Sequence, residues 1–151
     1  MSPASQAMFR STTDEWSTPS EVFDPLNEEF GFTLDVCADA DNAKCGRFFD
    51  KDADGLTQVW SGVCWMNPPY GRGIDRWIHK AWESARDGAT VVCLIPSRTD
   101  TRWWHDYVTD AADVRFVKGR IYFENPDRPR DRAPFPSAIV VFRPAVEGTD
   151  G

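Results

Sequence analysis

The sequence predicts an α/β sandwich, with a mostly parallel sheet and an antiparallel C-terminal edge. Up to about residue 112, apolar runs of strand length alternate with amphipathic helical patterns, which is typical of consecutive β–α units. Residues 90–95 form a continuous apolar run, as expected of a strand that is buried on both faces. The last third contains strand patterns without intervening helices, which favours an antiparallel end.

The elements of the first half follow from local patterns. A helix is expected to begin at Pro19, with Ser17 or Thr18 as its cap, and to end at Gly31. A buried strand is expected at residues 32–38, and a small one at 47–49, inside an irregular acidic stretch. The strand at 63–66 ends at two prolines, which cannot continue a central ladder of hydrogen bonds.

The second half adds two helices and three strands. The first helix, residues 73–86, has apolar side chains on one face, and the second is expected at 101–112. Strands are expected at 114–117, 121–123 and 138–142, with a Pro/Arg-rich loop at 124–136.

Composition bounds the class of protein. A chain of 151 residues corresponds to one ordinary domain. No apolar run approaches the roughly 20 residues that a membrane span needs, and no signal peptide is recognised, so neither a membrane nor a secretory route is expected. The four cysteines show no regular spacing, which favours reduced thiols in the cytoplasm over a disulfide framework or a metal site.

The net charge of −7 does not exclude a polyanionic partner, because the charge is unevenly distributed. Residues 1–66 carry 4 basic and 12 acidic side chains, whereas residues 67–151 carry 13 basic and 12 acidic ones. Residues 118–143 include six basic side chains and three acidic ones. This pattern is compatible with a one-sided, salt-sensitive contact with a polyanion, and equally with solvated surface charges.

Residues 67–70 read Asn-Pro-Pro-Tyr, between a predicted strand and a Gly-rich helix start. Successive prolines fix φ, so the Asn67 amide and the Pro68 carbonyl can present a rigid pair of hydrogen-bond acceptors. Tyr70 offers a flat ring for stacking. An exocyclic amine on a planar ring matches this set, because its two hydrogens need two acceptors. A simple strand-ending turn is the alternative interpretation.

This motif resembles the catalytic motif of amino-methyltransferases that use S-adenosylmethionine, and the wider pattern is similar to the phage-type DNA N6-adenine methyltransferase (phage Dam) family. The resemblance covers residues 14–143 through DEWSTPSEVFDPL, LDVCADADNAKC, DGL, WMNPPYGR, LIPSRTDTRWWHDYV, VRFVKGRIYF and APFPSAIVVF. It implies a Rossmann-like methyltransferase sandwich with helices on both faces. Residues 14–143 are then one minimal methyltransferase domain, between a disordered tail at 1–13 and a frayed tail at 144–151.

The resemblance also implies a site for the cofactor S-adenosyl-L-methionine. The cofactor-binding residues carried over are Trp16, Thr18, Pro19, Asp35, Cys37, Ala38 and Asp54. The first three match a Trp-x-Thr-Pro segment that lies near the methionine end of the cofactor in relatives. Asp35 opens a cofactor motif that normally contains a glycine-rich turn, which is missing here. Asp54 resembles an acid that binds the cofactor's adenine amine, although an ordinary Asp-Gly turn explains it as well.

The reaction implied is direct methyl transfer to N6 of an adenine flipped out of double-stranded DNA, because N6 is otherwise engaged in base pairing. The catalytic residues expected are Asn67, Pro68, Pro69 and Tyr70, with no metal. Residues expected to contact DNA are Arg98, Arg128, Arg130, Arg132 and Phe135, since arginines meet phosphates. A solvated loop is the alternative for the last four.

The family suggests a phage-encoded enzyme that protects DNA against restriction in the host cytoplasm. Three alternatives stay open at this point: an N-methyltransferase for RNA, one for a protein glutamine, and a non-catalytic nucleic-acid-binding relative with the same fold. The oligomeric state, monomer or homodimer, is also open.

Overall fold

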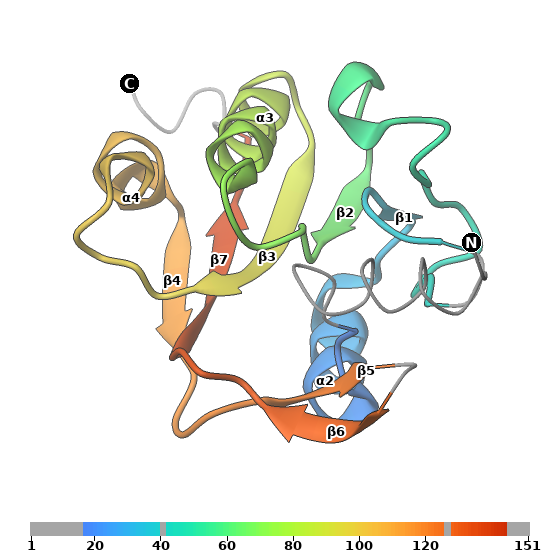
Figure 1. Ribbon diagram of the computed structural model, residues 1–151. Coiled ribbons are helices and arrows are strands. Elements are labelled where there is room, and N and C mark those ends of the chain that lie inside the picture. The colour runs from blue at the N-terminus through green and yellow to red at the C-terminus, as the bar shows by residue number, and fades with distance from the viewer. Residues whose placement is uncertain (1–16, 40–41, 126–127, 145–151) are drawn as a thin grey trace, which may run out of the picture.

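The computed structural model of the protein describes residues 17–39, 42–125 and 128–144. Within these residues, five strands form one sheet in the order β1-β2-β3-β7-β4, and two more form a separate ribbon (Figure 1). The strands of the larger sheet are β1 (Leu34–Asp35), β2 (Val63–Met66), β3 (Thr90–Pro96), β4 (Asp113–Phe116) and β7 (Ser137–Phe142). The ribbon consists of β5 (Tyr122–Asn125) and β6 (Arg128–Arg132).

The sheet is mixed, which corrects the predicted arrangement. β1 pairs with β2, and β2 with β3, in parallel, whereas β7 is antiparallel to both β3 and β4. The antiparallel strand therefore lies inside the sheet, and β4 forms the edge. Burial explains the order: all six residues of β7 are buried, as a strand covered on both faces requires, whereas β4 is only half-buried.

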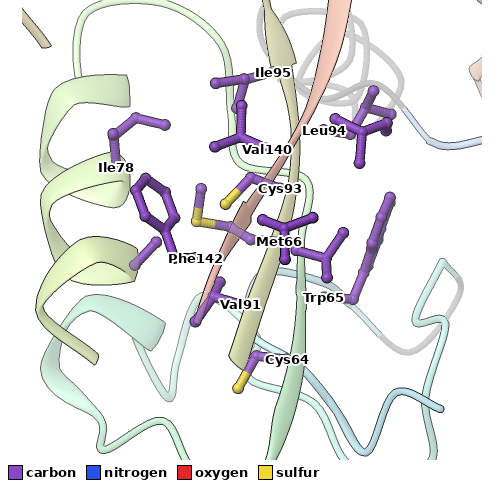
Figure 2. Packing of buried hydrophobic residues seen from close by; sticks show 14 of the residues in the cluster. Cys64, Trp65, Met66, Ile78, Val91, Cys93, Leu94, Ile95, Val140 and Phe142 are labelled. Carbon is purple, nitrogen blue, oxygen red and sulfur yellow. The ribbon is translucent and has the colours of Figure 1, made fainter. Parts of the chain in front are cut away.

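Helices cover both faces of the sheet. The helices of the described residues are α2 (Ser20–Phe30), α3 (Ile74–Arg86) and α4 (Arg102–Asp106). Figure 2 shows Met66 and Cys93 pointing toward Ile78 of α3, while Trp65 projects from the opposite face. There the Trp65 ring meets Phe23 of α2 edge-on, with 5.2 Å between ring centroids. None of the described helices is long and apolar enough to cross a bilayer.

Several predicted elements differ in extent. The strand expected at 32–38 is reduced to β1, whose Asp35 forms a single parallel bridge to Phe48. The helix expected at 101–112 is α4 followed by a separate 3₁₀ turn at Val108–Asp110. The N-cap of α2 is Pro19, not Ser17 or Thr18, and it provides no side-chain cap because proline has no polar side-chain group. The Thr18 hydroxyl accepts a hydrogen bond from Asn67.

Much of the Pro/Arg-rich segment is strand, which corrects the loop expected at 124–136. Residues 124–125 and 128–132 form most of the β5–β6 ribbon, and residues 133–136 are irregular. The ribbon lies beyond the end of the sheet at which β2, β3 and β4 stop (Figure 1). The prolines did not prevent pairing, because a two-stranded ribbon consists of edge strands, where a missing N–H is tolerated.

Replacing Ile78 by Ala tests the packing of α3. Ile78 is fully buried against the sheet, so its truncation leaves a cavity and should lower the free energy of unfolding by about 2–4 kcal/mol. The matched change Glu83→Ala, on the exposed face of the same helix, should cost under ~0.5 kcal/mol. Urea denaturation of both variants measures the difference. Equal losses of unfolding free energy would contradict the packing of Ile78 against the sheet.

Candidate active site

One cavity of about 650 Å³ lies where the parallel strands β1 and β2 end. Eight of the residues predicted from the sequence line it: Thr18, Asp35, Cys37, Ala38, Asp54, Asn67, Pro68 and Pro69. Pro19 is buried beside them at the start of α2, and Trp16 lies outside the described residues. Candidate cofactor residues and three of the four candidate catalytic residues, up to 51 positions apart in sequence, therefore share one space.

Asp35 organises the loop after β1, which forms one wall of the cavity and has no glycine-rich turn. Its side chain is only 2 % exposed, and its two oxygens accept hydrogen bonds from the backbone N–H groups of Cys37 (3.2 Å) and Lys44 (3.0 Å). Burial raises the pKa of this carboxyl to about 6, although the two amides oppose the shift. The loop after β1 is thus held by a carboxylate rather than shaped by a glycine-rich turn.

Asp54 and Gly55 form the turn considered above, and the turn itself borders the cavity. Asp54 adopts a left-handed conformation (φ 56°), and its Oδ1 accepts a hydrogen bond from the Leu56 N–H (3.2 Å). At Gly55, a Cβ would overlap the carbonyl oxygen of Val36, so only glycine fits. The two interpretations of Asp54 are therefore compatible, since a capping carboxylate can also face the cavity.

Several cavity residues were not predicted from the sequence. The most informative are Lys44, Phe49, Lys51 and Trp77. Trp77 lies on the apolar stripe of α3, and its periodicity assigns it to the core, yet its ring reaches Gly55 and stacks near Trp60 at 6.1 Å. The other three fall in an irregular stretch, where no period or spacing signals a common site.

Asn67 is held at both ends of its carboxamide. Its Nδ2 donates to Thr18 Oγ1 (3.0 Å), and its Oδ1 accepts a hydrogen bond from the Tyr70 hydroxyl (2.8 Å). The same hydroxyl lies 3.1 Å from the carbonyl oxygen of Leu94, in β3. These contacts connect the segment before α2, the turn after β2 and the centre of the sheet.

The ring of Tyr70 does not line the cavity. It is 3 % exposed, and this burial raises the pKa of its phenol. The rings of Phe123 and Phe135 meet it edge-on, at centroid distances of 6.1 and 5.3 Å. Stacking of Tyr70 on a base stays a prediction, and it requires that the ring first be uncovered.

The residues predicted to contact DNA fall in two places. Arg98 is exposed after β3, with its guanidinium carbon 5.9 Å from the centre of the Phe135 ring, which in turn meets Tyr70. The other three arginines belong to β6, at alternating positions 128, 130 and 132. Arg132 is exposed, and the side chains at 128 and 130 lie outside the described part of the structure.

The sequence is similar to those of known proteins. The sequence profile of the family "DNA N-6-adenine-methyltransferase (Dam)" matches residues 5–149. The DNA N-6-adenine-methyltransferase of Haemophilus phage HP1 is 32% identical over 141 residues, covering 89% of this chain and 82% of its own. A protein of Escherichia coli K12 named "Putative methyltransferase YfdM" is 38% identical over 65 residues, covering 38% of this chain and 71% of its own.

The pKa of Asp35 predicts a specific dependence of stability on pH. Because the folded-state pKa (about 6) lies above the ordinary value of 3.8, folding favours the protonated carboxyl. The stability that this group contributes is complete below pH 3.8 and is lost as the pH rises through 6. The loss amounts to at most about 3 kcal/mol.

Urea denaturation between pH 4 and pH 7.5 measures this loss. The difference between wild type and Asp35→Asn should change across that window. Asp106→Asn, which alters an exposed carboxyl on α4, serves as the control. Parallel profiles for wild type and Asp35→Asn would contradict the raised pKa.

Proposed function

Since the chain belongs to the DNA N-6-adenine-methyltransferase (Dam) family, whose reaction is methylation of the N6 amine of adenine in DNA, we propose that its cavity binds S-adenosyl-L-methionine. The observation that supports this best is the convergence of the Asn-Pro-Pro segment with Thr18, Asp35 and Asp54 around one cavity. A methyl donor and an acceptor amine must meet in such a place, because direct transfer requires both at once.

The residues around the cavity fit the proposed cofactor. About 650 Å³ lies within the usual range of small-molecule sites. When bound, S-adenosylmethionine supplies a methyl group on a positively charged sulfur, and a carboxylate such as Asp35 favours a nearby cation. Trp77 and Phe49 provide apolar surface for a ring. Thr18 and Pro19 are assigned to the methionine end, and Asp54 to the adenine amine.

The proposed catalytic role of Asn67 and Pro68 is to hold the target amine. Asn67 Oδ1 and the Pro68 carbonyl each accept one N6 hydrogen, which directs the nitrogen lone pair toward the methyl group. Holding two reactants in a reactive orientation lowers a barrier by several kcal/mol, so this task alone gives a substantial rate increase. Pro69 stiffens the same turn.

The target base has to leave the duplex before it can reach this site, which costs a few kcal/mol. We assign to Tyr70 the stacking surface for the flipped base. Phe135 lies 5.3 Å from the Tyr70 ring, on the segment between β6 and β7. Movement of that segment on DNA binding would uncover the ring.

The β5–β6 ribbon and Arg98 are the proposed DNA contacts. They lie around the Tyr70 and Phe135 rings, and the segment 118–143 has a local excess of basic residues in an acidic chain. Arginines bind phosphates in any sequence, so these contacts position the duplex without selecting a site.

The biological role that we propose is protection of phage DNA from restriction, in the cytoplasm of the host. The functional unit proposed is residues 14–143, with a Rossmann-like arrangement of its sheet and helices. The alternatives, methylation of RNA or of a protein glutamine and non-catalytic binding, receive no specific support from the described residues.

Asn67→Ala tests the catalytic assignment. Loss of one amine acceptor should lower methyl transfer by at least ~100-fold, while cofactor affinity changes little because the carboxamide is only one of many lining groups. Tritium transfer to DNA, nucleoside analysis for N6-methyladenine, and calorimetry with S-adenosylmethionine measure the three quantities. Near wild-type transfer would refute the role of Asn67, and absence of cofactor binding by the wild type would refute the cavity assignment.

Charge reversal at Arg128, Arg130 and Arg132 tests the ribbon. Each lost phosphate contact should reduce the slope of log Kobs against log salt by about 0.9 in magnitude and weaken binding. Fluorescence anisotropy with a DNA duplex at several salt concentrations measures both. Arg86→Glu, at the end of α3 opposite the cavity, is the control. An unchanged slope in the triple variant would remove the ribbon from the interface.

A further inference from the structure

We propose that Thr18 is a positioning residue for Asn67: its hydroxyl fixes the plane of the carboxamide, so that Oδ1 is presented to the target amine. This inference rests on the proposed function, in which Asn67 accepts a hydrogen bond from N6. It assigns the hydroxyl of Thr18 to Asn67, while the rest of the residue keeps the place at the methionine end of the cofactor that the proposed function gives it.

The contact itself is direct and partly buried. Asn67 Nδ2 donates to Thr18 Oγ1 at 3.0 Å, across 49 positions of sequence. Thr18 is 1 % exposed although it lines the cavity. Because the Thr18 side of this bond is almost inaccessible to water, the bond constrains the carboxamide more than the same bond would at the surface.

The two proposed acceptors differ in what holds them. The carbonyl of Pro68 belongs to a backbone stiffened by two proline rings. The carboxamide of Asn67, by contrast, turns about a terminal torsion that has only broad preferences. Its orientation must therefore come from partners, and rotation by half a turn would present donors, not an acceptor, to the amine.

The position of Thr18 is itself fixed by its neighbour. Thr18 precedes a proline, and such a residue is restricted to extended conformations. Pro19 itself is also extended, with φ −69° and ψ 152°. The Pro19 carbonyl accepts hydrogen bonds from the N–H groups of Val22 (3.0 Å) and Phe23 (3.1 Å), at the start of α2. The Thr18 hydroxyl is thus anchored to a helix that packs against the sheet.

Tyr70 contacts the other end of the carboxamide, but its contact can be exchanged. A phenol has one proton, and Tyr70 has two acceptors in reach, Asn67 Oδ1 at 2.8 Å and the Leu94 carbonyl at 3.1 Å. When an amine donates to Oδ1, the phenol proton can turn to Leu94 without loss of a hydrogen bond. The hydrogen bond from Nδ2 to Thr18 is unaffected by this exchange and still fixes that end of the carboxamide.

Three variants of Thr18 test the proposal. Thr18→Val keeps the shape and removes the hydroxyl, whereas Thr18→Ser and Thr18→Ala both lack the methyl group and differ only in the hydroxyl. We expect kcat at saturating cofactor to fall roughly 10- to 100-fold in the Val and Ala variants and to recover in the Ser variant. The calorimetric Kd for S-adenosylmethionine should change less than about threefold.

Thr109→Val is the matched control. Its hydroxyl donates to the His105 carbonyl on the surface (2.7 Å), so its loss should leave kcat unchanged. The comparison of Ser with Ala decides the matter if the Val variant does not fold.

The possible outcomes separate this inference from the proposed function. A wild type that produces no N6-methyladenine would refute the proposed function. With an active wild type, equal kcat in all three variants would refute the role of Thr18. A rise in cofactor Kd at constant kcat would assign the hydroxyl to the cofactor, and equal loss in Ser and Ala would reduce Thr18 to packing.

Discussion

The buried carboxylate of Asp35 is the interaction on which the cavity depends. β1 has only two residues, too few to hold the chain that follows. The carboxylate compensates by accepting hydrogen bonds from two amides seven positions apart, while the Asp35 backbone pairs with Arg47 and Phe49 (3.0 Å each). Burial of a charge is costly, and the raised pKa reflects that cost. Burying Asp35 thus lowers stability locally, while its hydrogen bonds fix the conformation of the loop that forms this wall of the cavity.

The parallel register of β1, β2 and β3 then determines what meets at that wall. Asp35 pairs with Trp65, and Met66 pairs with Cys93. The segments that follow β1 and β2 therefore leave the sheet at the same end, and Leu94 of β3 lies just beside them. Two unlike loops, one rich in acids and one stiffened by prolines, are thereby brought together. The Tyr70 hydroxyl joins the second loop to Leu94. The register of the sheet therefore also fixes the relative positions of the residues around the cavity.

The elements predicted correctly are those whose structure depends on residues close together in the sequence. The strand before Asn67, the helix at 73–86 and the apolar strand at 90–95 match β2, α3 and β3 within one residue at each end. The Asn-Pro-Pro segment and Asp35 were recognised by residue type. The place of β7 inside the sheet, the ribbon at 122–132 and the burial of Tyr70 were not predicted, because each depends on partners distant in sequence. Trp77 was missed because a core stripe and a cavity wall have the same periodicity.

The ribbon also leaves the sheet and returns to it at one point. β4 and β7 are paired neighbours, and the Val117 N–H donates to the Ser137 carbonyl (3.0 Å) at the base of the excursion. A segment whose two ends are already adjacent can lengthen, shorten or be exchanged with little strain on the pairing below it. The ribbon, for which we propose DNA contact, can therefore vary among related chains while the sheet below it is retained. For the same reason, an engineer can graft different ribbons onto one constant sheet.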